Sequence, residues 1–448
     1  MSGTGLPPGR GRGGTGAAAL AAAAALALAA LPATPAHAQE ESGPAGPPPP
    51  YRTAESAEPV EGTPSSADAP QLEAGAIYTD QLEPGDDLYY GVVLDAESSY
   101  YLSAVAAPEP GTKVAYRDGF SLELTTTGGD ACNVGNNRTF QSDGAARPIA
   151  ISQVRTIAEG DACQEAGNYL LRLVRTSDAT SSPAAWPVEL RVMAEPAAEG
   201  ERAAPPPGDW LTPEDAPAPS GQAEAVTGGT GFNDAQPIEP GNWRDDIAPG
   251  ETRFYKVPVD WHQQLGVTLD LSNAELSDSF GFVSNGIGLE VYTPFRSPAV
   301  EGTTSSYNGG PTQLATITAP VAYDNRLSDE GPMVTRNRVA GWQYIAVHLH
   351  EAVELSDADT VGLTLRVAVH GDAVEGPEYA EPGLAEAGFG VTEEVRDQAR
   401  EGIRDEQLAA AASNETKELL GYAGLGAGVA LLGVVGAWYL IGRRAGAR

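Results

Sequence analysis

The sequence predicts an all-β protein: two tandem β-sandwich domains, followed by a helical juxtamembrane stalk and one C-terminal transmembrane helix. Two segments, 71–195 and 230–370, consist of short alternating apolar runs separated by turn residues, which is the pattern of antiparallel sheet. The two segments repeat the same motifs at a slowly changing offset. A third stretch, 419–441, contains no charged residue and is long enough to cross a bilayer.

Residues 1–38 have the order of a secretory signal peptide. Arg10 and Arg12 lie in a polar opening segment, an Ala- and Leu-rich run follows over 17–31, and small residues come next. This run is too short and too rich in alanine to compete with 419–441 as a permanent span. We therefore predict that 1–38 is removed and that the mature chain begins at or near Gln39.

The apolar stretch 419–441 predicts the membrane span. As a helix it extends roughly 35 Å, against a bilayer core of about 30 Å. Arg443 and Arg444 follow it within a short stub, 442–448, and by the positive-inside rule this stub is cytoplasmic. A buried core helix is the alternative. The expected location is the cell membrane, single-pass, with the N-terminal bulk extracytoplasmic and the C-terminus cytoplasmic.

Small residues on the span suggest a packing face. Gly424 and Gly428 form a Gly-x-x-x-Gly pair, which lets two helix backbones approach closely in lipid. The alternative is that glycine is simply common in this sequence and in membrane spans. We predict that this face docks on a membrane-spanning partner or on a second copy of the chain.

Three segments of low complexity separate the domains. They are rich in Pro, Ala, Glu and Gly, so we expect a disordered linker at 39–70 and further linkers at 196–229 and 371–390. A helix is expected over 391–418, because apolar residues recur every four positions and acidic residues precede arginines by three. This helix is predicted to be a semi-rigid stalk that leads into the span.

The two β-rich segments read as a tandem duplication. Residues Ile77–Asp95 align with Asn242–Asp260 at a constant offset of 165, and each stretch has a Pro-Gly turn followed by a strand. The alignment pairs Tyr90 with Tyr255, and further along Tyr169 with Tyr344. We expect each pair of tyrosines to superpose and to anchor the two cores.

These motifs resemble the bacterial pre-peptidase C-terminal domain. The residues that carry the resemblance are QLEPGDDLYY (81–90) and AGNYLLRLV (166–174). The resemblance implies a small β-sandwich of the kind appended to exported proteases. The second copy inserts one residue before Tyr344 and a long stretch over 294–340, and no protease domain is attached. The whole chain also resembles single-pass surface proteins of Gram-positive bacteria, which implies no activity.

The two cysteines predict one disulfide bond. Cys132 and Cys163 are both in the first β-rich segment, and an even count in an exported domain favours pairing. A catalytic thiol is the alternative. The second segment has no cysteine, so the bond is an addition to the repeated unit.

Charge and motifs exclude several classes of function. The chain has a net charge of −34, which excludes general affinity for nucleic acid. There is no Gly-x-Ser-x-Gly, His-Glu-x-x-His or Walker motif, so we expect no catalytic residue and no cofactor. His348 and His350 are two zinc-ligand types at i, i+2, and Asp86-Asp87 and Asp245-Asp246 are calcium-ligand types. A polar strand face and solvated turns are the alternatives, and we predict no metal site.

The sequence therefore predicts a non-enzymatic, membrane-anchored extracytoplasmic protein that binds or scaffolds in the bacterial cell envelope. The expected partner is an envelope protein or polysaccharide, together with a spanning partner or self-association through the transmembrane helix. An accessory membrane subunit of an enzyme such as a protease is the alternative. This alternative is supported by the resemblance, because the pre-peptidase C-terminal domain is usually attached to exported enzymes.

Overall fold

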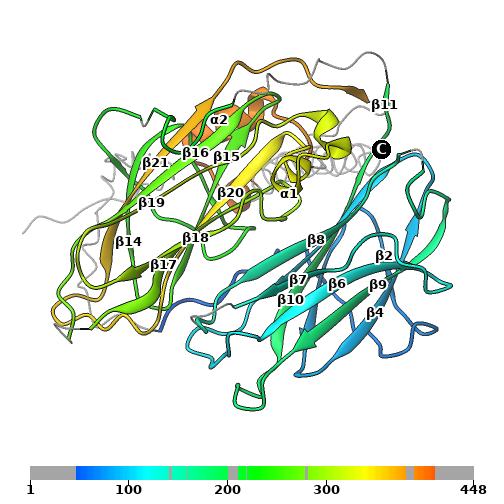
Figure 1. Ribbon diagram of the computed structural model, residues 1–448, viewed down its shortest axis with the longest axis horizontal. Helices are drawn as coiled ribbons and strands as arrows, with labels where there is room; N and C mark the ends of the chain where they lie inside the picture. Colours follow the sequence, from blue (N-terminus) through cyan, green and yellow to red (C-terminus); the bar gives the residue numbers. More distant parts are fainter. Residues whose placement is uncertain are drawn as a thin grey trace, which may run out of the picture. The chain divides into compact units, whose positions relative to one another are not determined.

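The computed structural model describes residues 47–140, 144–158, 160–199, 210–217, 219–277, 281–379 and 388–408. Within them the chain is mostly β, and the strands form two pairs of sheets, each pair a β-sandwich (Figure 1). We refer to the sandwich of the first repeat as sandwich 1 and to that of the second as sandwich 2.

Sandwich 1 consists of two five-stranded sheets. One sheet has the order β1-β3-β10-β5-β8 and the other β2-β4-β9-β6-β7. All neighbours are antiparallel except the two short leading strands, β1 and β2, which pair in parallel with β3 and β4. The strands are β1 (Glu58–Pro59), β2 (Gln71–Leu72), β3 (Ile77–Leu82), β4 (Asp87–Leu94), β5 (Ser99–Ala106), β6 (Gly119–Thr126), β7 (Asn136–Thr139), β8 (Ile149–Arg155), β9 (Gly167–Thr176) and β10 (Trp186–Glu195).

Sandwich 2 repeats this topology strand for strand. Its sheets have the orders β12-β14-β21-β16-β19 and β13-β15-β20-β17-β18, so β12 takes the place of β1, β14 of β3 and β21 of β10. The strands are β12 (Glu224–Ala225), β13 (Gln236–Pro237), β14 (Gly241–Ile247), β15 (Thr252–Val259), β16 (Gln264–Leu271), β17 (Val283–Tyr292), β18 (Thr303–Tyr307), β19 (Thr312–Ile317), β20 (Gly341–Leu349) and β21 (Val361–His370). The predicted duplication accounts for this order.

One side-chain arrangement occurs in both sandwiches. The Tyr90 hydroxyl donates to Asp80 Oδ2 at 2.7 Å, and the Tyr255 hydroxyl donates to Asp245 Oδ2 at the same distance. Each carboxylate also accepts a backbone N–H, from Gly62 in sandwich 1. The glycine is needed there, because a Cβ at Gly62 would lie 2.7 Å from the Tyr90 ring. Tyr90 and Tyr255 thus occupy the same place, as the alignment predicted.

The second predicted pair, Tyr169 and Tyr344, lies on equivalent strands but not at equivalent positions. Tyr169 pairs with Val92, whereas Tyr344 pairs with Lys256, one residue earlier on the matching strand. A shift of one residue turns a side chain to the opposite face of a sheet. Tyr169 therefore packs in the core of sandwich 1, while Tyr344 leaves the core of sandwich 2 for its outer face. The prediction of Tyr344 as a core anchor is wrong, and the residue inserted before it is the reason.

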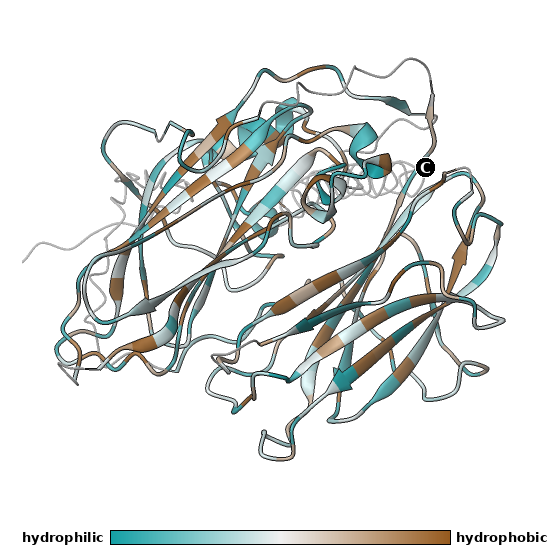
Figure 2. Cartoon of the chain, viewed as in Figure 1, coloured by the Kyte–Doolittle hydropathy of each residue, from teal (hydrophilic) through white to brown (hydrophobic). Residues whose placement is uncertain are grey.

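Each sandwich encloses its own apolar core. Along the strands apolar and polar residues alternate, as the brown and teal bands in Figure 2 show, and the apolar side chains meet between the two sheets. The cores are formed by equivalent strands, for instance by Leu190 on β10 and Leu365 on β21. Burial of these side chains is the main stabilising contribution to both sandwiches.

The segments predicted as linkers take part in the fold where the structure describes them. From residue 47 onward the first segment adds β1 to sandwich 1, and β12 opens sandwich 2 within 196–229. β11 (Ala198–Glu199) pairs with β22 (Glu378–Tyr379), so two of the predicted linkers form a small sheet of their own. Few large apolar residues anchor these stretches, which is why composition predicted no structure there.

The C-terminal helix is shorter than predicted and is packed against sandwich 2. Helix α2 (Glu393–Glu401) begins at the N-cap Thr392 and ends at Gly402, whose φ of 65° is left-handed. Its Ala399 is buried, and Arg396 forms an ion pair with Asp260 at 2.6 Å. The expected continuous helix over 391–418 is wrong in this part, because glycine ends it. Two other short helical segments are η2 (Tyr323–Leu327) and α1 (Pro332–Arg336).

Several predictions fall outside the described residues: the signal peptide 1–38, the span 419–441 with Gly424 and Gly428, and the stub 442–448. Across the residues that the structure does describe, none of the helices has the length and apolar character needed to cross a bilayer.

Candidate functional site

The two sandwiches share a buried interface in which one strand of sandwich 1 is central. On β10, Val188, Leu190 and Val192 point into the core, so the residues between them point to the opposite face. That face carries Glu189 and Glu195, whose side chains are both fully buried. A charge without water is costly unless it is paired, so each carboxylate needs partners from elsewhere in the chain.

Glu195 is held by three residues. Arg326 of sandwich 2 donates to both carboxylate oxygens, at 3.0 and 2.9 Å, in a bidentate pair. The hydroxyls of Tyr101 and Tyr379 donate to the same carboxylate at 2.6 and 2.8 Å. The apolar side chains around this group come from both sandwiches, among them Met193 and Phe295.

Glu189 is held in a second group of this kind. Arg296 of sandwich 2 forms an ion pair with it, and the side chains are 3 % and 0 % exposed. Asn233 Nδ2 and the backbone N–H of Ala54 also donate to this carboxylate, at 2.8 and 2.9 Å. Arg296 has a φ of 61°, which is unfavourable for a residue with a side chain, so the ion pair is made at some cost in backbone conformation.

A third ion pair joins the sandwiches between β7 and β17. Arg138 donates to Glu290 Oε1 at 2.6 Å, and Arg147 lies 3.9 Å from the same oxygen. Burial would raise the pKa of Glu290, but these two arginines together lower it below its ordinary value. Three carboxylates that would be expensive to bury alone are thus each matched by an arginine of the other sandwich.

Aromatic side chains fill the interface between these ion pairs. Phe232 packs edge-on against Tyr292 and Tyr344, with ring centroids 5.1 Å apart in both cases. Val105 and Ala150 of sandwich 1 belong to the same apolar cluster. The interface therefore combines apolar packing with three ion pairs, and it holds the two sandwiches as one unit.

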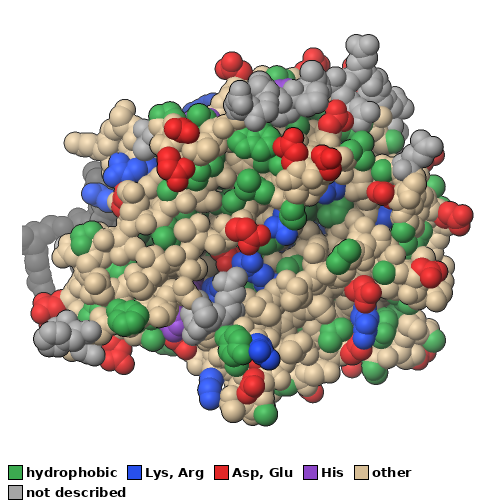
Figure 3. Space-filling view, viewed as in Figure 1, with side chains coloured by type: hydrophobic (Ala, Val, Ile, Leu, Met, Phe, Trp, Pro, Cys, Tyr) green, Lys and Arg blue, Asp and Glu red, His purple; other side chains and the backbone are tan. Residues whose placement is uncertain are grey.

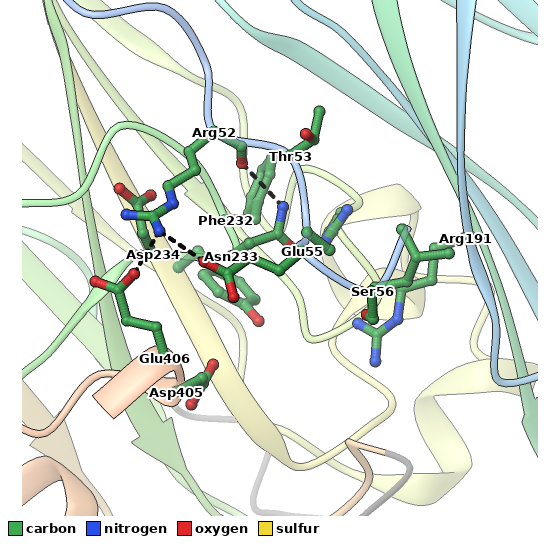
Figure 4. Close-up of a pocket in the computed structure, with 14 residues that line it drawn as sticks. Arg52, Thr53, Glu55, Ser56, Arg191, Phe232, Asn233, Asp234, Asp405 and Glu406 are labelled. Carbon is green, nitrogen blue, oxygen red and sulfur yellow. Dashed lines mark hydrogen bonds and ion pairs between the residues drawn. The ribbon is translucent and has the colours of Figure 1, made fainter. Parts of the chain in front are cut away.

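A cavity of about 340 Å³ opens beside this interface. Its walls come from five parts of the chain: the segment before β1, the start of β3, the outer face of β10, the loops and outer sheet of sandwich 2, and the segment after α2 (Figure 4). The volume lies at the lower end of the range for ligand pockets. The lining residues are Arg52, Thr53, Ala54, Glu55, Ser56, Ile77, Arg191, Phe232, Asn233, Asp234, Arg296, Tyr344, Asp405 and Glu406. We call this cavity the composite cleft.

The floor and the rim of the composite cleft differ in character. Phe232 and Tyr344 contribute aromatic surface. At the rim, Arg52 forms an ion pair with Glu406 at 2.6 Å, and Asp405 accepts two bonds of 2.7 Å from Lys256. Aromatic surface beside a few convergent polar groups is the usual composition of a site for a small ligand.

The cysteine pair predicted from sequence is confirmed, at a place apart from the cleft. Cys132 follows β6 and Cys163 precedes β9, and their sulfurs are bonded. The bond ties two loops of sandwich 1 together, with Cys132 buried against the core. No residue lining the composite cleft belongs to either loop.

The histidines and aspartates considered as metal ligands do not converge on a common site. His348 Nδ1 lies 3.0 Å from Thr252 Oγ1, and His350 Nδ1 accepts the backbone N–H of Ala352. Asp87 is bound by Arg172 through two hydrogen bonds, and the arginine lowers the pKa of this carboxyl. In the described ranges no group of three or more His, Cys, Asp or Glu side chains is placed to hold a metal ion.

Sequence reasoning missed the composite cleft. Glu189 and Glu195 read as the solvent face of a strand, and Arg296 and Arg326 lie in a long insertion with no periodicity. One signal was available: β10 carries Met193 on the face that also carries its charges, and an apolar residue there favours a covered face.

Comparison with known proteins adds little to this description. No protein-family model and no curated protein sequence matches the chain. Among solved structures, the tandem CBM22-1–CBM22-2 domain of Paenibacillus barcinonensis Xyn10C is 13% identical over 65% of this chain and 85% of its own, with a TM-score of 0.18. The CUB1-EGF-CUB2 domain of human MASP-1/3 is 9% identical over 65% of this chain and 99% of its own, with a TM-score of 0.16. A chain of the Broad Bean Stain Virus structure is 7% identical over 72% of this chain and 94% of its own, with a TM-score of 0.19. At these scores the likenesses carry no argument about function.

Proposed function

We propose that this chain is a non-enzymatic binding protein of the bacterial cell envelope, anchored in the membrane by 419–441, and that its ligand is held in the composite cleft. The observation that carries the proposal is the interface. Two buried ion pairs, Glu189–Arg296 and Glu195–Arg326, and a partly buried third pair, Glu290–Arg138, join the sandwiches into one unit with a cavity that neither forms alone. A fixed cavity lined by several chain segments is preorganised for a ligand.

The sequences near both ends of the chain and the disulfide support the proposed location. The signal-like 1–38 and the arginines after the span favour export of the sandwiches. The Cys132–Cys163 bond is of the kind that persists in oxidising compartments. Figure 3 shows Asp and Glu side chains spread over the face in view rather than gathered in one patch, which suits a solvated domain outside an anionic membrane.

Photo-cross-linking in intact cells tests the binding role. A photoreactive residue replaces Ser56, which is exposed and lines the composite cleft. The matched control places the same residue at Val93, which is 62% exposed on the outer face of β4. We expect a defined adduct with an envelope protein or glycan from position 56 and none from position 93. Equal yields at both positions, or no adduct at either, would refute a ligand site in the cleft.

Protease treatment of intact, wall-stripped cells tests the topology. Residues 71–370 should be digested and the short stub after the span protected, since the sandwiches are expected outside. Protection of 71–370 would overturn the extracytoplasmic location.

A further inference from the structure

We propose that the composite cleft binds a singly charged carboxylate through the guanidinium of Arg191 and the hydroxyl of Tyr344. The inference deepens the proposed function, because it takes the same cleft as the ligand site and assigns the chemistry of its ligand. Seven charged side chains line the cavity, and they differ in whether a partner in the chain satisfies them.

Most charged side chains of the cleft are already satisfied. Arg52 is paired with Glu55 and Glu406, and Asp405 is paired with Lys256. Asp234 accepts the backbone N–H groups of Thr230 and Gly231, at 2.8 to 3.0 Å. These groups have little capacity left for a ligand, so they define the walls of the cleft rather than its binding group.

Arg296 is satisfied in the same way. It pairs with Glu189, and its Nη2 donates to Asn233 Oδ1 at 2.8 Å. Glu189 in turn accepts bonds from Arg296, Asn233, the backbone of Ala54 and the Tyr51 hydroxyl, and these four donors use the acceptor sites of its carboxylate.

Arg191 is the exception. It projects from β10 two residues after Glu189, on the face that lines the cleft. Within the part of the chain that the structure describes, its guanidinium forms no hydrogen bond and no ion pair. In the view of Figure 4, Arg191 lies beside Ser56, on the other side of the cavity from Glu406. Burial and the positive charge of Arg296 lower the pKa of Arg191, and the carboxylates of Glu189 and Asp405 offset only part of this shift.

Tyr344 supplies a second donor at the same place. Its ring packs on Phe232, and among the described residues its hydroxyl forms no hydrogen bond. Arg191 and Tyr344 line the same cavity. Burial raises the pKa of the phenol, and the positive charges of Arg191 and Arg296 act against this shift. Tyr344 lines the cleft, so this hydroxyl is available to donate to a ligand oxygen.

The two donors match the geometry of a carboxylate. Guanidinium and carboxylate form two parallel hydrogen bonds, and a hydroxyl can donate to one of the same oxygens. The Arg326–Glu195 pair with its two tyrosine hydroxyls shows this arrangement within the same interface. Arg191 and Tyr344 provide the guanidinium and the hydroxyl of such a group, and we propose that the ligand provides the carboxylate.

The surroundings favour one negative charge over two. Four acidic side chains line the cleft beside three arginines, and the whole chain has a net charge of −34. A dianion such as phosphate would be repelled more strongly than a monocarboxylate. The aromatic surface of Phe232 and Tyr344 would cover the apolar part of a compact ligand. An acidic sugar of an envelope glycan and the terminal carboxylate of a peptide share this chemistry.

Isothermal titration of the full chain in detergent tests the proposal. The probes are sodium glucuronate with glucose as its neutral analogue, N-acetyl-Ala-Ala with its C-terminal amide, and inorganic phosphate. We expect one of the two carboxylates to bind and both neutral analogues and phosphate to bind at least tenfold more weakly. Binding of glucuronate would identify the glycan source, and binding of the dipeptide acid the peptide source.

Substitutions assign the binding to the named groups. R191Q should weaken carboxylate binding by about 10- to 100-fold, because it removes a charge-assisted bidentate contact. R191K should recover part of the loss, and Y344F, which keeps the ring, should weaken binding by about three- to tenfold. The matched control is R244Q, since Arg244 is an exposed arginine of β14 outside the cleft.

The result that overturns the inference is a wild-type chain that binds neither carboxylate, or one whose affinity is unchanged in R191Q. Thermal unfolding of R191Q and Y344F establishes that a loss of binding is not a loss of folding. An adduct from position 56 in cells together with no carboxylate binding would leave the proposed binding role intact and refute only this ligand chemistry.

Discussion

Arg326 and Glu195 form a bidentate ion pair, at 2.9 and 3.0 Å, in which neither side chain is more than 4 % exposed. The two residues are 131 positions apart, one on β10 of sandwich 1 and the other on η2 of sandwich 2. A buried pair seldom adds much stability over apolar residues of the same shape, but it is costly to break. It therefore fixes how the sandwiches join.

Removal of Arg326 from its pair with Glu195 should strongly destabilise the folded chain. R326M leaves the Glu195 carboxylate buried with only two tyrosine hydroxyls, and we expect the free energy of unfolding to fall by about 3–5 kcal/mol. The measurement is denaturant unfolding at pH 7. The matched control is R172M, whose pair with Asp87 is 36% and 41% exposed and should contribute less than about 1 kcal/mol. Equal effects of the two substitutions would contradict the special role of the buried pair.

The duplicated tyrosine–aspartate contact predicts matched effects in the two sandwiches. Y90F and Y255F each remove one hydrogen bond to a carboxylate, at a cost of about 1–2 kcal/mol. Y116F should change nothing, because Tyr116 is 53% exposed. Chemical denaturation of the three variants is the test. A large difference between Y90F and Y255F would show that the two sites are not equivalent.

The disulfide should stabilise sandwich 1, which contains both cysteines. Its loop spans 31 residues, so the chain-entropy model predicts a loss of about 3–4 kcal/mol in the C132S/C163S variant. Without reductant, alkylation of the folded wild-type chain should label neither cysteine. Two reactive thiols in the purified chain would refute the bond in solution.

The buried His348 predicts a loss of stability in acid. Burial, with Arg147 and His350 nearby, lowers the pKa of its imidazole well below 6.5. The unfolded chain takes up a proton near pH 6.5 and the folded chain does not, so the contribution is complete above pH 6.5 and decreases as the pH falls below it. Glu290 lines the same small cavity and keeps its charge over this range, because its pKa is lowered.

We expect wild type to lose up to about 1.4 kcal/mol more than H348Q between pH 7.5 and pH 5.5. The measurement is urea unfolding at both pH values. Identical pH dependence in the two proteins would show that His348 is not kept neutral by the fold.

The membrane span gives a prediction that rests on sequence alone. Replacing Gly424 and Gly428 by leucine should lower association of the span in a membrane two-hybrid assay while leaving insertion intact, because bulky residues keep helix backbones apart. Association that persists unchanged in the double variant would exclude this face as an interface.

The repeated strands and turns were predictable because their signals are local. Alternation marks the strands, and the Pro-Gly turns work because Gly85 and Gly250 adopt φ of 85° and 80°. The register of β20 was not predictable, since a single inserted residue moved Tyr344 from the core to the interface.

The interface and the cleft were not predictable for a different reason. Whether Glu189 faces water or an arginine depends on contacts with Arg296, 107 positions away, and no local pattern encodes such a contact. The same holds for Arg191, which has an ordinary place in an alternating strand. That Arg191 lacks a partner becomes visible only when the partners of the surrounding charged side chains are known.

The central claim is that the ligand site exists only while the two sandwiches are joined. Photo-cross-linking from position 56 in a chain that carries R296A and R326A tests it most directly, with R244A as the matched surface variant. Circular dichroism and cooperative thermal unfolding establish that the sandwiches stay folded. We expect the adduct to be lost in R296A/R326A and retained in R244A. An adduct of undiminished yield from the opened interface would contradict it.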